Sequence, residues 1–260
     1  MKKIIRSLIS ALLWMLLKPL PLALKAKLIT RLTDLSAAGT LPGETLRFLF
    51  EIENRLYCLE TKASIAYGDG VHTADRHLEY HGFVAGNLYA GERVLVIGRS
   101  IGYTCNEIAV RAPDIKVLGF DRQADEVSFA RGRYRRENLE FLHGDACLAL
   151  PEGEFDVVTM SNVLEHIEQR VELLKKIEAS YRPKRYLFRV PLFERDWRVP
   201  LKKELGLDYR LDDSHFIEYT REEFREELRQ AGLEITRMEV CWGEIWSVAE
   251  SADRKGRAQG

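Results

Sequence analysis

Short, continuous apolar runs alternate with longer mixed segments through the middle of the chain. Four such runs span residues 94–97, 115–120, 139–142 and 155–160. The first run, residues 94–97, is short and entirely apolar, which is typical of a parallel strand that is buried on both faces. The segments between them, beginning with residues 103–111, carry apolar residues at helical spacing. The pattern therefore predicts an α/β fold with a Rossmann-like, doubly wound sheet.

The second half of the chain continues this alternation. Residues 186–191 form a fifth apolar run. A helix is predicted to begin after Thr220, because Glu223 three residues later completes a capping box. The last two strands are expected at residues 233–235 and 240–242, which brings the predicted sheet to seven strands.

The N-terminal part of the chain has a different pattern. Residues 1–33 contain Lys and Arg but no Asp or Glu, and apolar residues occupy one helical face between residues 4 and 16. The continuous apolar run, residues 8–17, is too short to span a bilayer, which needs about 20 residues. Two interpretations stay open. The helix lies on an anionic membrane surface through residues 1–24, or it packs on the domain or on a second subunit.

The predicted organisation is therefore an extension followed by one domain. Residues 1–40 are a basic, amphipathic helical extension, and residues 41–250 form the domain. Within the domain, residues 41–90 are expected to be a helical cap, with a helix at 78–88, and residues 91–250 to be the core. The polar residues 251–260 are expected to be a disordered tail.

Net charge and the spacing of the cysteines exclude several classes of function. The formal net charge of −1 gives no electrostatic case for nucleic acid as a partner. The four cysteines are widely spaced, with no Cys-x-x-Cys, which argues against a zinc site and against a disulfide scaffold. A reduced, cytoplasmic setting is the simpler interpretation, with peripheral contact at the inner face of the membrane if the N-terminal helix binds there.

The first strand leads into a glycine-containing loop that bears on ligand binding. Gly98 and Gly102 flank this loop, and a helix follows directly. Glycine lets the backbone turn sharply and approach a ligand, and the helix N-terminus offers free N–H groups. Asp121 ends the second strand, 19 residues after Gly102, where its carboxylate can accept hydrogen bonds from both ribose hydroxyls of a nucleoside.

The order of these segments, with Leu164-Glu165-His166 after the fourth strand, resembles the class I S-adenosylmethionine-dependent methyltransferases of the small-molecule branch. The resemblance covers about residues 75 to 245. It implies a methyltransferase whose cofactor is S-adenosylmethionine. The implied donor-binding residues are Gly98, Ser100, Gly102, Asp121, Asp145, Ala146 and Ser161.

In that family the glycine loop wraps the methionine and ribose of the donor, and the acid at Asp121 would bind the ribose. Residues 144–146 would contact the adenine edge, and residues 161–166 would face donor and substrate. Residues 67–81, together with the basic N-terminal helix, look similar to methyltransferases found with bacterial surface-polysaccharide pathways. This implies O-methylation of a small polar acceptor, or of a glycan or lipid-linked one.

The chain departs from the family pattern near the loop. Val96 stands where the family usually has an acid, Ser100 replaces the middle glycine, and Arg99 adds a cation. These three residues motivate an alternative, a catalytically impaired binding or scaffold protein on the same fold. A dehydrogenase is disfavoured, because the loop lacks Gly-x-Gly-x-x-Gly.

Methyl transfer to a hydroxyl requires alignment of the acceptor and removal of its proton. His166 is the first candidate base, because imidazole titrates near neutrality and the resemblance places this residue near the edge of the fourth strand. That His166 instead caps or packs a helix stays open. His215 is the second candidate. No metal site is predicted, since the histidines of the cap lack a tight ligand pattern: His72, His77 and His81.

Overall fold

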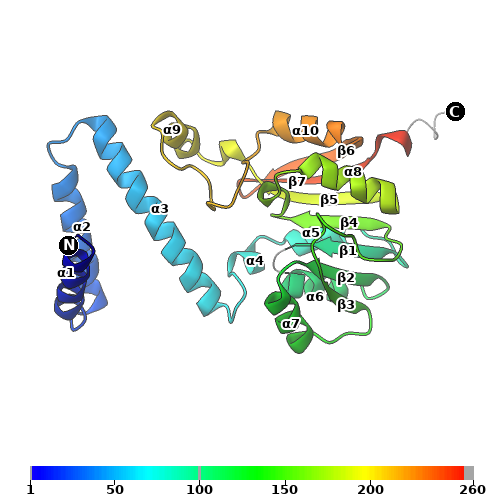
Figure 1. Ribbon diagram of the computed structural model, residues 1–260, viewed down its shortest axis with the longest axis horizontal. Coiled ribbons are helices and arrows are strands. Elements are labelled where there is room, and N and C mark those ends of the chain that lie inside the picture. The colour runs from blue at the N-terminus through cyan, green and yellow to red at the C-terminus, as the bar shows by residue number, and fades with distance from the viewer. Residues whose placement is uncertain (1, 99–100, 255–260) are drawn as a thin grey trace. The chain divides into compact units, whose positions relative to one another are not determined.

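The computed structural model describes residues 2–98 and 101–254. The chain divides into two compact units, Met1–Leu56 and Tyr57–Gly260, with the boundary inside helix α3 (Pro42–Tyr67) (Figure 1). Two residues of the predicted loop, Arg99 and Ser100, lie outside the described residues. So do residues 255–260 of the predicted tail.

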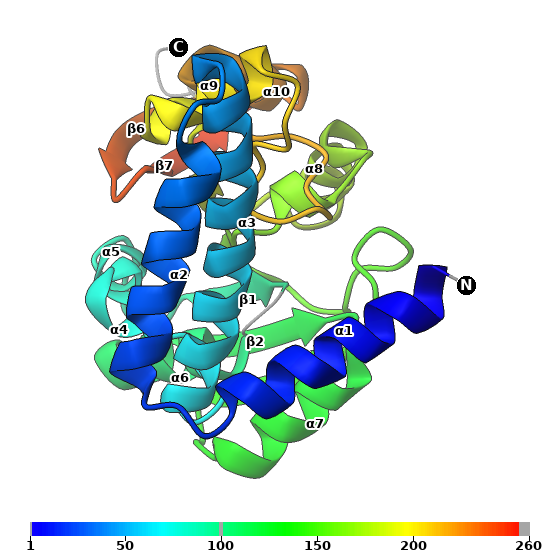
Figure 2. The same cartoon turned by 90° about the vertical axis from the view of Figure 1, so that its left-hand side faces the viewer.

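The first unit begins with two helices, α1 (Lys2–Leu17) and α2 (Leu22–Ala37), which Figure 2 shows as separate helices joined by a short turn. No residue of α2 is buried. Large apolar side chains on both helices are more than half exposed: Leu12, Leu13, Trp14, Met15, Leu16, Leu22, Ile29, Leu32 and Leu35. Among the described residues, none of the helices combines the length and the hydropathy needed to cross a bilayer.

The second unit is built on a mixed sheet of seven strands within the described residues. The strands are β1 (Arg93–Ile97), β2 (Lys116–Asp121), β3 (Leu139–His143), β4 (Val157–Ser161), β5 (Arg185–Pro191), β6 (Leu233–Cys241) and β7 (Glu244–Ser251). Their order is β3-β2-β1-β4-β5-β7-β6. Strands β1 to β5 pair in parallel, and β7 is antiparallel to both β5 and β6. This confirms the predicted α/β, Rossmann-like doubly wound sheet.

Helices cover both faces of this sheet (Figure 1). One face is covered by α5 (Tyr80–Ala85), α6 (Ile101–Arg111) and α7 (Ala124–Arg133), and the other by α8 (Arg170–Tyr181) and α10 (Arg221–Gln230). Side chains alternate along β1. Val94 and Val96 therefore pack in the core under α5, α6 and α7, and Leu95 and Ile97 pack in the core under α8 and α10. Burial on both faces explains why residues 94–97 of β1 are a continuous apolar run.

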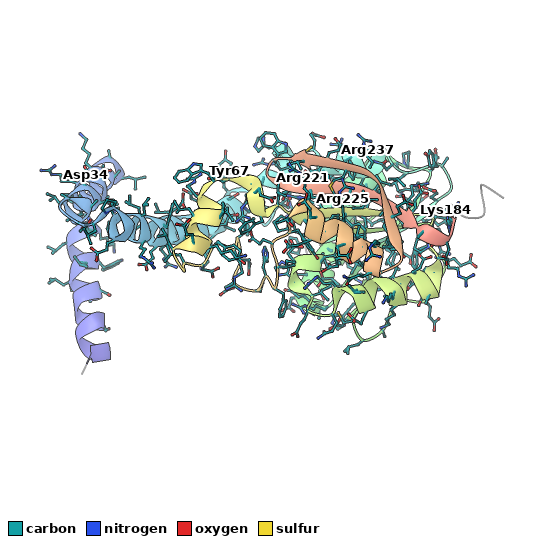
Figure 3. All side chains as sticks on the ribbon, turned by 90° about the horizontal axis from the view of Figure 1, so that it is seen from above. Asp34, Tyr67, Lys184, Arg221, Arg225 and Arg237 are labelled. Atoms are coloured by element: carbon teal, nitrogen blue, oxygen red, sulfur yellow. The ribbon has the colours of Figure 1, made fainter. Side chains whose placement is uncertain are left out.

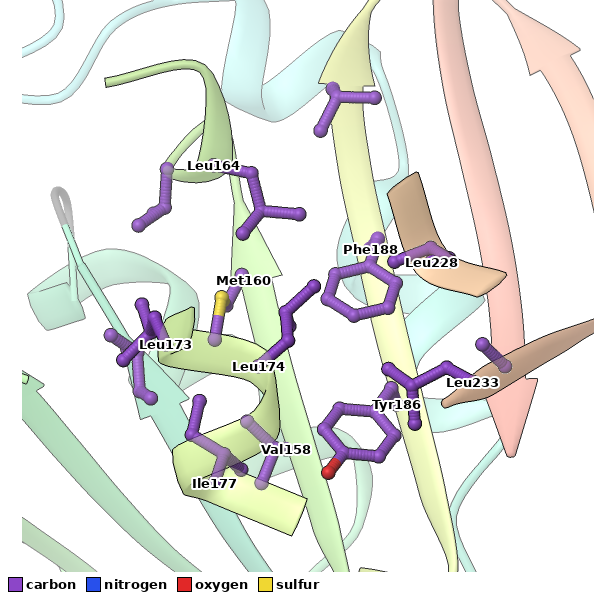
Figure 4. Packing of buried hydrophobic residues seen from close by; sticks show 14 of the residues in the cluster. Val158, Met160, Leu164, Leu173, Leu174, Ile177, Tyr186, Phe188, Leu228 and Leu233 are labelled. Carbon is purple, nitrogen blue, oxygen red and sulfur yellow. The ribbon is translucent and has the colours of Figure 1, made fainter. Parts of the chain in front are cut away.

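The core beneath α8 is well packed. Figure 4 shows Leu173, Leu174 and Ile177 of α8 lying over Met160 of β4 and Phe188 of β5. All five side chains are at most 3% exposed. Burying an aliphatic or aromatic side chain of this size stabilises the fold by about 1.5–3 kcal/mol.

Helix α10 follows its sequence pattern closely. The capping box of Thr220 and Glu223 is present, with the Glu223 N–H donating to Thr220 Oγ1 at 3.1 Å. Phe224 is buried, whereas Figure 3 shows Arg221 and Arg225 on the outer side of the helix. The apolar stripe therefore faces the sheet and the basic residues face solvent.

Three predicted elements differ in the structure. The predicted strands 233–235 and 240–242 were wrong as separate strands, because both segments contribute to β6; Trp242 and Gly243 form the two-residue turn to β7. These two turn residues have φ of 56° and 77°, the left-handed geometry that a tight hairpin requires. The predicted helix 78–88 is interrupted by Glu79 at φ 54°, which separates α4 (Ala74–His77) from α5.

The remaining elements are short. Helix α9 (Arg198–Glu204) and the 3-10 turn η2 (Phe193–Arg195) lie in the long segment after β5. A second 3-10 turn, η1 (Leu164–His166), follows β4. Strand β7 ends at Ser251, the residue at which the predicted tail begins.

Candidate active site

A pocket lies at the carboxyl ends of the parallel strands, where the strand order reverses between β1 and β4. This is the position at which open α/β sheets bind ligands. The space between its walls, including the open mouth, measures about 700 Å³, which is the size of a small-molecule site. Five predicted site residues line it together: Gly98, Asp121, Asp145, Ala146 and His166.

Gly98 ends β1 in a conformation that requires glycine. Its φ is +102°, and a Cβ added there would lie 2.2 Å from Cγ2 of Val163. The absence of a side chain lets the backbone of this turn pass directly beneath Val163, which also lines the pocket. Glycine at the end of β1 is thus required by the contact with Val163, and both residues line the pocket.

Two carboxylates hold the next walls in place. Asp121 ends β2 and is 3% exposed, and its Oδ1 accepts the N–H of Gln123 at 2.7 Å. Asp145 follows β3, and its Oδ1 accepts the N–H of Cys147 at 2.8 Å. Between them, Gly144 leaves no room for a side chain, since a Cβ there would lie 2.6 Å from the Phe120 ring. These residues fit a nucleoside whose ribose lies at Asp121 and whose base lies at residues 144–146.

The other predicted donor-binding residues have different positions. Gly102 does not line the pocket, and a Cβ there would lie 3.1 Å from Cβ of Ala130, so this glycine lets α6 approach α7. Ser161 is also outside the lining, and its Oγ accepts Nη1 of Arg189 at 3.4 Å. Ser100 cannot be placed, because it lies outside the described residues.

The two candidate bases come together. His166 lines the pocket, and the buried ring of His215 meets it edge to face, with centroids 4.5 Å apart and an interplanar angle of 82°. The Phe216 N–H donates to the carbonyl of Glu165 at 2.7 Å, which holds the loop after β5 against η1. The fold thus places both imidazoles at one edge of this pocket.

Hydrogen bonds determine the tautomer of each ring. His166 Nδ1 lies 2.9 Å from Oγ of Ser214, whose hydroxyl donates to Asp212 at 2.6 Å. The Ser214 hydroxyl lowers the pKa of Asp212 to about 2, so this carboxylate is ionised and can only accept. The single hydroxyl proton of Ser214 is used in the hydrogen bond to Asp212, so Ser214 can only accept from His166. Nδ1 of His166 is therefore the donor.

The same logic applies to His215. Its Nδ1 lies 3.3 Å from the Glu218 carboxylate, which is buried and also paired with Arg195. An ionised carboxylate accepts hydrogen bonds and does not donate them, so His215 Nδ1 carries the proton. In both rings the lone pair is therefore on Nε2.

Glu165 is an unusual member of this edge. Its side chain is fully buried, and neither carboxylate oxygen receives a hydrogen bond from another described residue. Burial raises the pKa of this carboxyl to about 8, and the negative charges of Glu244 and Glu218 act in the same direction. A buried carboxyl without donors is costly when ionised, so such a group takes up either a proton or a cation.

Sequence reasoning missed a second polar cluster beside the pocket. Arg189 donates from Nε to Glu244 at 2.6 Å, and its Nη1 lies 3.7 Å from Asp75. Asn162, which lines the pocket, donates to the other oxygen of Glu244 at 3.3 Å, so the two are connected. Its place directly after β4 and the φ of 52° mark Asn162 as a site residue. Only the first of these signals is visible in the sequence.

Comparisons with known proteins identify the family. A model of the methyltransferase domain matches residues 72–237, more than half of the chain. The chain belongs to this methyltransferase family. A search of curated protein sequences gives no significant match.

Solved structures share the fold. A chain from the complex between the Haloferax volcanii Trm112 methyltransferase activator and a methyltransferase has 18% identity and a TM-score of 0.58, and the alignment covers 73% of this chain and 96% of that one. The mitomycin 7-O-methyltransferase MmcR has 20% identity and a TM-score of 0.57, and the alignment covers 76% of this chain and 60% of that one. The magnesium protoporphyrin IX methyltransferase of Synechocystis PCC 6803 with bound S-adenosylhomocysteine has 17% identity and a TM-score of 0.54. That alignment covers 67% of this chain and 83% of the other.

The protein is therefore an S-adenosylmethionine-dependent methyltransferase. None of these findings favours the alternative of an impaired scaffold. Val96, where the family usually has an acid, is 3% exposed and packs in the core under α6. In this chain the position therefore contributes an apolar side chain to the core.

Proposed function

We propose that the protein methylates a hydroxyl oxygen of a small polar acceptor or of a glycan or lipid-linked one. The observation that carries this proposal is the pair of His166 and His215 at the edge of the donor pocket. With Nε2 unprotonated, an imidazole accepts a proton near neutral pH. A hydroxyl acceptor needs such a base, whereas a thiolate or carboxylate acceptor does not.

S-adenosylmethionine, when bound, supplies an electrophilic methyl carbon. Gly98, Asp121, Asp145 and Ala146 would hold the nucleoside part of the donor in the pocket. Nε2 of His166 would take the acceptor proton while the hydroxyl oxygen forms the new C–O bond and the methyl–sulfur bond breaks. The products are a methyl ether and S-adenosylhomocysteine, and the proton then leaves His166 for solvent. Ser214 and Asp212 would keep His166 in the required tautomer.

The glycan or lipid-linked class is supported by the first unit. Residues 1–33 carry basic side chains and no acidic ones, and apolar side chains of α1 are exposed. A helix of this kind suits peripheral contact with an anionic surface, here through residues 1–24. A lipid-linked acceptor would be presented at the same surface.

The test is a methylation assay with the full-length protein and a donor that carries a deuterated methyl group. The acceptor panel contains free sugars, nucleotide sugars and polyprenyl-phosphate-linked sugars, and products are analysed by mass spectrometry. We expect a methyl ether on one hydroxyl and no product from the analogue that lacks this hydroxyl.

The variants His166→Asn and His215→Asn provide the matched measurement. Loss of a general base lowers kcat by about 100-fold or more, while the Kd for S-adenosylhomocysteine should stay within about twofold of wild type. Methylation of nitrogen or of a carboxylate, or an unchanged kcat in both variants, would refute the proposal.

A further inference from the structure

Three side chains with metal-binding atoms meet beside the donor pocket. The ligand atoms of Glu165, His166 and His215 all lie within 4.8 Å of one another. Glu165 and His166 come from η1, and His215 comes from the loop after β5. The hydrogen bond from Phe216 N–H to the Glu165 carbonyl fixes the two segments against each other. The cluster is thus held by the backbone.

Both imidazoles are oriented as metal ligands are. Metal-binding histidines almost always donate their second ring N–H to an oxygen acceptor, which fixes the tautomer and the ring. His166 donates from Nδ1 to Ser214, and His215 donates from Nδ1 to Glu218. The lone pair on Nε2 of each ring is the electron pair that a metal ion would take.

The carboxylate supplies the independent observation. Glu165 is fully buried, and neither oxygen receives a hydrogen bond from another described residue. An ionised carboxylate in such a place is strongly destabilising unless a cation or donors compensate for it. The two buried carboxylates nearby, Glu218 and Glu244, are paired with Arg195 and Arg189, and neither arginine donates a hydrogen bond to Glu165.

We propose that Glu165, His166 and His215 bind one divalent transition-metal ion. Two imidazoles and one carboxylate suit Zn²⁺, Fe²⁺ or Mn²⁺, and a three-ligand set leaves positions open for water or substrate. The sequence predicted no metal site, because the histidines of the cap lack a tight ligand pattern. In the cluster found here the carboxylate is adjacent to one histidine but the other lies far along the chain.

This inference rests on the proposed function and refines the role of the two histidines. An acceptor hydroxyl that takes an open position on the ion loses its proton to water more readily, because the positive charge stabilises the alkoxide. In the metal-loaded protein the Nε2 lone pairs of both imidazoles are used as ligands, so the ion activates the acceptor there, and the base role of His166 described above belongs to the metal-free protein.

The test is calorimetric titration of the full-length, tag-free protein after treatment with a chelator. ZnCl₂, MnCl₂ and MgCl₂ are titrated separately, without donor or acceptor. We expect one Zn²⁺ per chain, weaker binding of Mn²⁺, and Mg²⁺ binding at least about tenfold weaker than Mn²⁺. The variants Glu165→Gln and His215→Asn should each weaken Zn²⁺ binding at least about tenfold, and His77→Asn, an exposed histidine of α4, should leave it unchanged.

Absence of Zn²⁺ binding by the wild type would overturn the proposal whether or not the variants fold. Equal Zn²⁺ binding by the wild type and Glu165→Gln would do the same. Mg²⁺ binding as tight as that of Mn²⁺ would overturn the choice of a transition metal. S-adenosylhomocysteine is titrated into the metal-free protein in parallel. Donor binding without metal binding refutes this inference alone, whereas metal binding without hydroxyl methylation refutes the proposed function.

Discussion

The rings of His166 and His215 meet edge to face, with centroids 4.5 Å apart, although the residues belong to segments on either side of β5. The Phe216 N–H holds the later segment to the carbonyl of Glu165. Because both segments emerge from the carboxyl ends of neighbouring parallel strands, the pair is positioned by the sheet itself. A rigid pair beside the donor pocket suits the alignment that methyl transfer requires.

Asp121→Ala should weaken the binding of S-adenosylhomocysteine. We expect the carboxylate at the end of β2 to accept the ribose hydroxyls, and its removal then costs about 1–3 kcal/mol, or about 5- to 150-fold in Kd. Calorimetric titration measures this, with a thermal unfolding curve to show that the loss of the bond to Gln123 leaves the variant folded. Asp114→Ala, at an exposed position before β2, is the control. Equal affinities of Asp121→Ala and the control would remove Asp121 from the donor site.

Gly98→Ala should destabilise the protein more than Gly91→Ala. Both glycines have positive φ, 102° and 82°, so each alanine carries a backbone penalty of about 1 kcal/mol. Gly91 has no atom within 4 Å of an added Cβ, whereas Gly98 would contact Val163 at 2.2 Å. Overpacking adds about 1–3 kcal/mol.

Denaturant unfolding of both variants measures this difference. A double variant, Gly98→Ala with Val163→Ala, removes the clashing methyl groups and keeps the unfavourable φ. Its loss of stability should therefore be smaller than the sum of the single losses. Strict additivity would show that the close contact does not determine the need for glycine.

The sequence predicted the parallel part of the fold well, for a physical reason. Strands β1, β2, β4 and β5 are buried on both faces over most of their length, so each appears as a mainly apolar run. The prediction failed for the last two strands because β6 consists mostly of exposed and half-buried residues and has no apolar run. Its end is set by the backbone of Trp242 and Gly243, a hairpin turn that apolar periodicity does not reveal.

The site was predictable as a list of residues but not as a geometry. The strand ends indicated Gly98, Asp121 and Asp145, because each follows an apolar run. The proximity of His215 to Glu165 depends on hydrogen bonds between segments far apart in sequence, from Phe216 to Glu165 and between His166 and Ser214, and no spacing rule contains them. The burial of Glu165 without hydrogen-bond donors is likewise a property of the packed fold.

The protein should lose stability in mild acid through His81. Burial, together with the charges of Arg111 and Arg189, lowers the pKa of this histidine to about 4. The unfolded chain has an ordinary pKa near 6.5 and takes up the proton first. The free energy of unfolding therefore falls as the pH drops from about 6.5 towards 4, and this contribution is retained above 6.5.

Urea unfolding at pH 7.5 and pH 5 checks this expectation. The wild type should lose about 2 kcal/mol more than His81→Gln between the two values. His143→Gln, at an exposed position on β3, should lose as much as the wild type. If His81→Gln shows the same pH dependence as the wild type, other groups cause the loss.

The N-terminal helix offers a test of peripheral membrane contact in which charge and apolar surface are separated. Leu12→Glu/Leu16→Glu places two acids on the apolar face of α1, and Ser7→Glu/Ser10→Glu places two on the polar face. Both variants change the net charge equally and lose the same attraction to anionic lipid, about 1 kcal/mol per charge. The leucine variant also loses two apolar side chains that are 57% and 60% exposed. It should therefore bind phosphatidylglycerol vesicles at least about tenfold more weakly than the serine variant in co-sedimentation.

Equal binding would refute insertion of the apolar face. A change from dimer to monomer in the leucine variant, measured without vesicles, would instead show that this face packs against a second subunit.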